Sequence, residues 1–125
     1  MAKKILVVED ETNITKIITS RLNASGYDVI CAYDGEQALY KLTIEKPDLI
    51  ILDIMLPVLS GYEVCYKIRK DETYKDYSSI PIIMLTAKSE LDDMKTGLDR
   101  GADAYITKPF KAETLISVIK SLLGE

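Results

Sequence analysis

Four short apolar runs constrain the fold of this chain more than any other feature of its sequence. They occupy residues 5–8, 49–52, 82–85 and 104–107. Continuous apolar runs of this length are typical of strands buried on both faces of a parallel sheet. Segments with apolar residues at helical spacing separate the runs, so strand-like and helix-like stretches alternate five times. Five such units predict an α/β fold in which helices cover both faces of one parallel sheet.

Apolar spacing, together with glycine and proline signals, places the expected elements along the chain. We expect strands at about 4–8, 27–33, 48–54, 81–87 and 104–107. We expect helices at about 13–25, 35–45, 62–70, 90–100 and 112–123. The second strand alternates between apolar and polar residues more than the others, as an edge strand does. The polar segment 71–79 is expected to be a surface connection.

Local signals define two helix boundaries and one helix face. Asp34 followed by Gln37 is a capping-box pattern at the start of the second helix. Gly26 stands where a glycine cap is expected after the first helix. The buried face of that first helix is predicted to consist of Ile14, Ile17, Ile18 and Leu22.

Size and charge exclude several classes of protein. A chain of 125 residues is long enough for its own core, and we expect residues 1–125 to form a single domain. The formal charge of −4, without a basic stripe, argues against direct nucleic-acid binding. No apolar run approaches the roughly 20 residues of a membrane span, and the N-terminal apolar stretch is too short for a signal peptide. We therefore expect a cytoplasmic protein.

The histidine and cysteine content restricts the kinds of catalytic and metal site that the chain could form. The chain has no histidine, so a zinc site or a Ser-His triad would be hard to build. Its two cysteines, Cys31 and Cys65, lack the spacing of a metal or redox motif. We interpret both as small apolar core residues, with a redox or metal role as the less favoured alternative.

Polar side chains follow four of the five predicted strands. Glu9 and Asp10 follow the first strand, Asp53 the third, Thr86 the fourth and Lys108 the fifth. Taken singly, each has a simpler interpretation as a solvated turn, a helix cap or a surface lysine. Because ligands bind just past the carboxyl ends of the strands in an open α/β sheet, we expect these residues to converge on one site.

Three carboxylates in one place suit a hard divalent cation, Mg²⁺ or Mn²⁺. Asp10 and Asp53 can bind the ion directly, Glu9 can hold a coordinated water, and the backbone carbonyl of Met55 can add an oxygen. Asp53 is the central acid and therefore the candidate nucleophile toward a phosphoryl group. Lys108 and the Thr86 hydroxyl can neutralise and bind the phosphoryl oxygens.

The motifs that carry these residues resemble those of a response-regulator receiver domain of two-component signalling. The matching segments are 7–11 (VVEDE), 52–57 (LDIMLP) with Gly61, 84–87 (MLTA), 101–105 (GADAY) and 108–110 (KPF). The resemblance implies a flavodoxin-like, doubly wound five-stranded sheet in the order 2-1-3-4-5. It also implies that Asp53 accepts a phosphoryl group from a phosphohistidine. The resemblance places that phosphohistidine on a sensor histidine kinase or a histidine phosphotransfer protein. The chain itself lacks histidine, so the donor is another molecule or a small acyl phosphate.

The resemblance also implies a conformational switch. Thr86 moves toward the phosphoryl group and Tyr105 turns inward, which remodels the face formed by the fourth helix, the fifth strand and the last helix. A half-buried strand aromatic is the alternative interpretation of Tyr105. The Lys108–Pro109 bond is expected to be cis, the isomer that only an X–Pro bond adopts at low cost. The fourth helix, with Gly97, is expected to be the most mobile element.

Two further positions are candidates for setting the lifetime of the acyl phosphate. Met55 and Lys88 lie two residues after Asp53 and Thr86, where they flank the path of an attacking water. The alternative for Met55 is a loop residue that covers apolar surface. We expect bulky Met55 to make the phosphorylated state last longer than seconds.

The chain departs from receivers of winged-helix transcription factors at their dimer salt bridges. Those receivers carry a second acid after Asp103 and an arginine in the last helix. Here the corresponding places hold Ala104 and, in the last helix, Ser117, Val118 and Lys120. A different polar interface could use Asp99, Arg100 and Lys111. Both a monomer and a phosphorylation-dependent dimer are therefore compatible with the sequence.

Two other functions remain open alongside the switch, which catalyses only its own phosphorylation and dephosphorylation. A Mg²⁺-dependent phosphohydrolase of the haloacid-dehalogenase kind has a similar aspartate nucleophile, but it places a second aspartate where this chain has Met55. A non-phosphorylated docking scaffold has no need for both the acids and Lys108. The switch is expected to act on a downstream protein or a detached effector domain, and not on nucleic acid or membranes.

Overall fold

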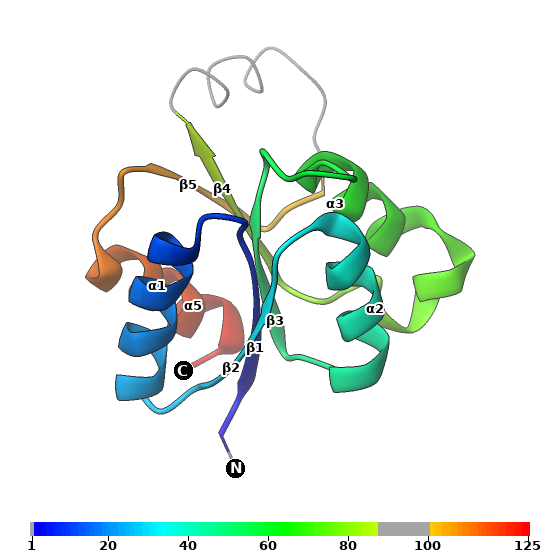
Figure 1. Cartoon of the computed structure of the whole chain (residues 1–125). Coiled ribbons are helices and arrows are strands. Elements are labelled where there is room, and N and C mark those ends of the chain that lie inside the picture. The colour runs from blue at the N-terminus through cyan, green and yellow to red at the C-terminus, as the bar shows by residue number, and fades with distance from the viewer. Residues whose placement is uncertain (1, 88–100) are drawn as a thin grey trace.

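The computed structural model describes residues 2–87 and 101–125 and has a five-stranded parallel sheet between two layers of helices (Figure 1). The strands are β1 (Lys4–Val8), β2 (Asp28–Ala32), β3 (Leu49–Asp53), β4 (Ile82–Ala87) and β5 (Ala104–Lys108). The helices are α1 (Thr12–Ala24), α2 (Gly35–Glu45), α3 (Gly61–Lys70) and α5 (Ala112–Leu123), with a short 3₁₀ helix at Glu72–Tyr77. The predicted fourth helix at about 90–100, with Gly97, Asp99 and Arg100, lies outside the described residues, and so does Lys88.

The strand order is β2-β1-β3-β4-β5 and every pairing is parallel, which confirms the predicted doubly wound topology. The edge position of β2 is also confirmed. Its central residues are only partly buried, whereas every residue of β3 is buried. Parallel pairing brings the carboxyl ends of all the strands to one edge of the sheet.

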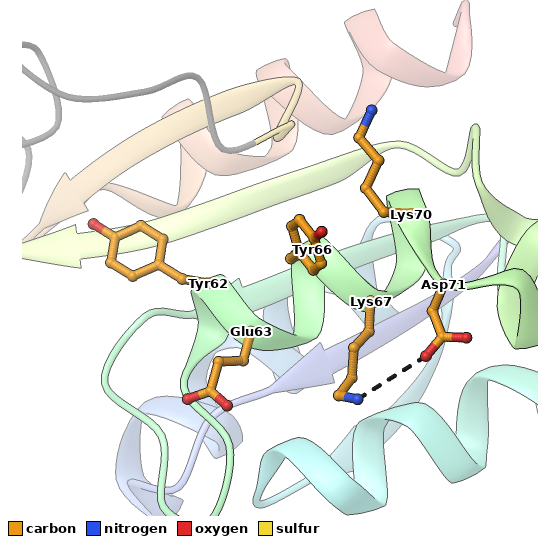
Figure 2. Close-up of a pocket in the computed structure, with 6 residues that line it drawn as sticks. All are labelled: Tyr62, Glu63, Tyr66, Lys67, Lys70 and Asp71. Atoms are coloured by element: carbon orange, nitrogen blue, oxygen red, sulfur yellow. Dashed lines mark ion pairs between the residues drawn. The ribbon is translucent and has the colours of Figure 1, made fainter.

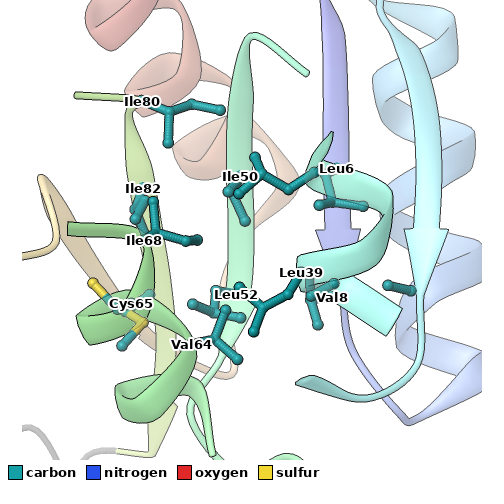
Figure 3. Packing of buried hydrophobic residues seen from close by; sticks show 14 of the residues in the cluster. Leu6, Val8, Leu39, Ile50, Leu52, Val64, Cys65, Ile68, Ile80 and Ile82 are labelled. Carbon is teal, nitrogen blue, oxygen red and sulfur yellow. The ribbon is translucent and has the colours of Figure 1, made fainter. Parts of the chain in front are cut away.

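Two apolar clusters fill the space on either side of the sheet. Figure 3 shows the cluster on the α2–α3 side, where Leu6, Ile50 and Ile82 of the strands meet Val64 and Ile68 of α3. The second cluster lies between the opposite face of the sheet and helices α1 and α5. Alternate strand residues point to opposite faces, so each continuous apolar run supplies both clusters.

The predicted helix boundaries agree with the caps in the structure. The Asp34 side chain accepts a hydrogen bond from the amide of Gln37 at 2.8 Å, as an N-cap does. The Gln37 side chain accepts from the amide of Tyr33, one residue before the position that a capping box uses. Gly26 adopts a positive φ of 93° directly after the C-cap of α1, a conformation that favours glycine.

Two expectations about individual segments were wrong or incomplete. Ile17 is 61% exposed and does not belong to the buried face of α1, because the helix packs through Ile18, Leu22 and the smaller Thr15. Segment 71–79 is a surface connection, but it contains the 3₁₀ helix, and Tyr74 and Tyr77 pack against the apolar cluster. Alternating polar and aromatic residues gave no periodic signal for this turn of helix.

The two cysteines form no disulfide with each other and differ in burial. Cys65 is buried within α3, as predicted, whereas Cys31 is only partly buried on the edge strand β2. No helix among the described residues combines the length and apolar character needed to cross a membrane.

Candidate functional site

The carboxyl ends of four strands deliver the predicted polar residues to one edge of the sheet. The register pairs Val8 with Leu52, so Glu9 and Asp53 follow neighbouring positions on β1 and β3. On β4 and β5 the register pairs Ala87 with Lys108, next to Thr86. Residues far apart in sequence thus meet because the sheet is parallel.

The three acids form a compact group of possible metal ligands. One carboxylate oxygen each from Glu9, Asp10 and Asp53 lies within 4.8 Å of the other two. Glu9 is fully buried and Asp53 is 4% exposed, whereas Asp10 faces solvent. Burying carboxylates this close together is unfavourable without a cation, since like charges disfavour each other's ionised form. Hard oxygen ligands at this spacing fit Mg²⁺, which commonly uses one or two carboxylates and several waters.

Lys108 is the cation that the chain itself supplies to this group. Its Nζ lies 2.9 Å from Glu9 Oε2 and 3.2 Å from Asp53 Oδ2. Burial works to lower the pKa of the Lys108 ammonium, but the hydrogen bond to Glu9 and the Asp53 charge outweigh it and raise that pKa. Lys108 is therefore a firmly protonated bridge between the two buried acids.

Burial has the opposite consequence for Glu9. It raises the pKa of the Glu9 carboxyl, and the Asp53 charge adds to the rise. The Lys108 ammonium and the Glu11 amide, which donates to Glu9 Oε1 at 3.2 Å, offset part of this shift. The site thus holds more negative charge than its own cation neutralises.

The connection between β3 and α3 fixes the Asp53 carboxylate. The amide of Met55 donates to Asp53 Oδ1 at 3.2 Å. Gly61, the first residue of α3, sits directly against the end of β3, where an added Cβ would lie 2.3 Å from the backbone oxygen of Asp53. Its amide donates to Ile54 O at 2.8 Å. Glycine at this position allows α3 to begin in direct contact with the backbone of Asp53.

Of the remaining predicted residues, Thr86 and the Lys108–Pro109 bond lie at the carboxyl ends of β4 and β5 and Met55 follows β3, whereas Tyr105 is the second residue of β5. Thr86 is buried, and its hydroxyl donates to the carbonyl of Ala87 at 3.1 Å. Tyr105 is partly buried and packs against the α2–α3 cluster. Met55 is 67% exposed. The Lys108–Pro109 peptide bond is cis, the isomer that the resemblance implied.

Sequence reasoning missed a second glycine that shapes the β3–α3 connection. Gly35 opens α2, and a Cβ there would lie 2.5 Å from Leu59 Cβ and 2.6 Å from Leu59 O. Helix α2 therefore rests directly on the loop that leads from Asp53 to α3. A glycine just after an N-cap is a weak signal, because many residues are tolerated at that position.

A separate pocket of about 450 Å³ lies along α3 and contains none of the residues of the acidic site. Figure 2 shows that all its lining residues come from α3 and the residue after it, with Lys67 and Asp71 forming an ion pair across one turn. Nothing in this pocket resembles the convergence of acids and lysine at the sheet edge.

Comparison with known proteins identifies relatives over nearly the whole chain. The family model described as "Response regulator receiver domain" matches residues 5–120. The alkaline phosphatase synthesis transcriptional regulatory protein PhoP of Bacillus subtilis is 50% identical over 98% of this chain and 49% of its own length. A probable transcriptional regulator ycf27 of Cyanophora paradoxa is 50% identical over 97% of this chain and 48% of its own length.

A solved structure shares the fold over the whole length of the chain. It is the receiver domain of the sensor histidine kinase PA1611 from Pseudomonas aeruginosa, described with a magnesium ion coordinated in its active site cleft. It is 33% identical, each chain covers 100% of the other, and the TM-score is 0.88. The chain spans about half the length of the curated relatives it matches. With its topology, its acidic site and these similarities, the chain belongs to the response regulator receiver domain family.

Proposed function

We propose that this domain is the phospho-accepting switch of a two-component system and that Asp53 is the acceptor. The observation that carries the proposal is the Lys108 ammonium, which bridges Asp53 and Glu9 inside a cluster of three acids. Such a site attracts and neutralises a phosphoryl group next to one fixed carboxylate. The family supports this role, since receiver domains are the receiving partners of two-component signalling.

The transfer needs little covalent chemistry from the protein. An oxygen of the Asp53 carboxylate attacks the phosphorus of a phosphohistidine on the partner, and an acyl phosphate forms. The P–N bond breaks, and its electron pair returns to the imidazole nitrogen of the donor, which then takes up a proton. The Met55 amide holds one Asp53 oxygen in place, so the other oxygen is the candidate attacking atom.

Glu9, Asp10 and Asp53 are the residues that would hold Mg²⁺ or Mn²⁺, with the Met55 carbonyl as a further ligand. When bound, the ion neutralises charge on the acids and on the phosphoryl oxygens. Lys108 contributes a point charge from the carboxyl end of β5, and it can exchange an Asp53 oxygen for a phosphoryl oxygen. These roles follow from the donor set and from the Lys108 contacts.

Thr86 and Tyr105 are the proposed relay to the output face. In the structure the Thr86 hydroxyl is satisfied by a carbonyl of its own strand, a bond it can exchange for a phosphoryl oxygen. Tyr105 is the partner of Met84 in the β4–β5 register, two residues before the position of Thr86. Movement of Thr86 therefore changes the packing next to Tyr105, and the signal leaves through the surface of β5 and α5.

The proposed partners follow from the same chemistry. A sensor histidine kinase or a histidine phosphotransfer protein donates the phosphoryl group. The output is a downstream protein or an effector domain, which a transcriptional regulator such as PhoP leads us to expect. We propose that the domain works as a monomer or as a phosphorylation-dependent dimer.

Intact-mass spectrometry after incubation with acetyl phosphate tests the proposal. The wild-type chain is expected to gain the mass of one phosphoryl group with Mg²⁺ and none with EDTA. Asp53→Asn is expected to gain none, and Asp28→Asn, an exposed acid at the other end of the sheet, serves as a matched control that behaves as wild type. Equal labelling of wild type and Asp53→Asn would contradict the proposal.

The same samples separate the two alternatives. A phosphohydrolase would release many phosphates per chain from a phosphomonoester, which the family does not favour. A scaffold would take up no phosphoryl group under any condition. A single addition that depends on Asp53 and Mg²⁺ distinguishes the switch from both.

Met55 is also proposed to lengthen the life of the acyl phosphate. Its side chain is exposed beside the acceptor, where it can hinder an attacking water, and Lys88 is the second candidate for this effect. We expect the phosphorylated wild type to decay over times longer than seconds and Met55→Gly to decay faster. A wild-type half-life of a second or less, measured by radiolabel loss, would contradict this role.

A further inference from the structure

Thr15 is a buried polar residue of α1 that the proposed chemistry does not use. It is 5% exposed, and its hydroxyl donates to the backbone oxygens of Glu9 and Glu11, both at 3.2 Å. A threonine inside a helix commonly donates to the carbonyl four residues earlier, which accounts for the bond to Glu11. Glu9 lies six residues earlier and outside the helix, so helix formation does not explain the second bond.

These two carbonyls flank Asp10, the exposed member of the acidic group. The amide of Thr15 also donates to Glu11 O at 3.0 Å, so one residue of α1 holds the peptide unit that follows Glu9 and the peptide unit that follows Glu11, on either side of the Asp10–Glu11 unit. The single hydroxyl proton is shared between two acceptors, as in other bifurcated bonds near helix ends. The N-cap residue of α1, Glu11, makes no side-chain cap hydrogen bond, so the Thr15 hydroxyl adds a contact that positions this strand-to-helix connection.

Other contacts fix Glu9 at its remaining polar atoms. Its amide donates to Ala32 O of β2 at 3.1 Å, and its carboxylate accepts from Lys108 and from the Glu11 amide. The Thr15 hydroxyl completes this set at the backbone oxygen, on the side that faces Asp10. The position of the exposed acid is thus set through backbone bonds from within the core.

We infer that Thr15 is a positioning residue for the divalent cation, and that its hydroxyl holds Glu9 and Asp10 in the arrangement that binds the ion. The inference rests on the proposed function, because it concerns the same site. Groups that orient metal ligands commonly change metal affinity by tenfold or more when they are removed. A free Glu9–Glu11 connection has to be ordered on binding, which weakens the site even though all three carboxylates remain.

Thr15→Val tests this with nearly unchanged shape, and Thr19→Val is the matched control. Thr19 lies one turn later on the same helix, and its hydroxyl contacts Cys31 Sγ at 3.5 Å instead of the acidic connection. Thr15→Ser keeps the hydroxyl and should restore wild-type behaviour. Each full chain is titrated with Mg²⁺ while the backbone amide shifts are followed by NMR.

We expect Thr15→Val to raise the Mg²⁺ dissociation constant about tenfold. Thr19→Val and Thr15→Ser should leave it unchanged. In metal-free protein, hydrogen exchange at the Glu11 amide should be faster in Thr15→Val than in Thr19→Val, which is a readout independent of the ion. If Thr15→Val does not fold, Thr15→Ala against Thr15→Ser makes the same comparison.

The outcomes separate this inference from the proposed function. Unchanged affinity in Thr15→Val, or an equal loss in Thr15→Val and Thr19→Val, overturns the role of Thr15 alone. A wild-type chain without Mg²⁺ affinity overturns the metal-dependent function itself. The inference is supported if Thr15→Val loses Mg²⁺ affinity while Thr19→Val and Thr15→Ser keep the wild-type affinity.

Discussion

Replacing Lys108 with methionine removes the one positive charge that lies between Glu9 and Asp53 in the described structure. The Nζ lies about 3 Å from an oxygen of each acid. At an effective dielectric constant of about 20, one such contact corresponds to roughly 5 kcal/mol of Coulomb energy before desolvation is counted. Breaking a fully buried pair typically costs about 3–5 kcal/mol. The Lys108 side chain is 24% exposed, so we expect about 2–3 kcal/mol.

The loss should depend on the divalent cation. Without Mg²⁺, Lys108→Met leaves two buried carboxylates side by side with no counter-charge. A bound cation replaces the missing charge, so saturating Mg²⁺ should stabilise the variant more than it stabilises the wild type. Urea denaturation followed by circular dichroism, in EDTA and in Mg²⁺, measures both differences.

The pH dependence gives a second signature of the same contact. Burial already raises the pKa of the Glu9 carboxyl, and loss of the Lys108 ammonium removes the main opposing contact. A carboxyl with a raised pKa in the folded state keeps its proton longer there than in the unfolded chain. Its contribution to stability is complete below the unfolded pKa and is lost as the pH rises through the folded pKa. The free energy of unfolding of Lys108→Met should therefore fall further below that of the wild type as the pH rises from weakly acidic to neutral.

Lys16→Met is the matched control, because Lys16 is an exposed residue of α1. It removes the same charge and adds the same side chain away from the acids. Equal unfolding midpoints of Lys108→Met and Lys16→Met in EDTA would refute the electrostatic account of the site. If Lys108→Met loses the same free energy of unfolding in EDTA and in Mg²⁺, Mg²⁺ does not replace the Lys108 charge. That result would refute the predicted cation dependence.

Three further substitutions probe contacts elsewhere. Gly61→Ala places a Cβ against the backbone of Asp53 and should cost about 3 kcal/mol in urea unfolding, with slower phosphorylation. The Tyr27 hydroxyl donates to Glu125, and burial and this contact raise the Tyr27 pKa to about 12. ¹³C NMR of labelled tyrosines should show a late-titrating signal that is absent in Tyr27→Phe, and the stability from this bond should be lost as pH rises toward that pKa. Arg69→Met removes the hydrogen-bond donors of three backbone carbonyls. It should lower the free energy of unfolding by about 3 kcal/mol, measured by thermal unfolding.

The parallel sheet and the meeting of the acids at one edge could be predicted from local patterns, whereas the strand order was implied by the resemblance to receiver domains. Continuous apolar runs indicate buried parallel strands, and a parallel sheet brings their carboxyl ends together. Given that edge, residues 9, 53 and 108 had to become neighbours. The sequence pattern was sufficient because each of these side chains directly follows a strand.

Contacts between elements could not be predicted in the same way. Periodicity marks Ile17 as apolar but does not tell which of two adjacent isoleucines faces the sheet. Two contacts depend on how α1 and α2 pack in the folded chain: the hydrogen bonds from Thr15 to the residues of the acidic site, and the close approach of Gly35 to Leu59. Neither residue carries a local signal for that role, since threonine inside a helix and glycine near a cap are both common.

Chemical trapping of the acyl phosphate identifies which residue accepts the phosphoryl group. Borohydride reduces an acyl phosphate to an alcohol, so a phosphorylated aspartate becomes homoserine that peptide mass spectrometry can locate. After treatment with acetyl phosphate and Mg²⁺, we expect homoserine at position 53 alone, and none when EDTA replaces Mg²⁺. Homoserine at Asp10 or at an acid outside the site, with Asp53 intact, would contradict it.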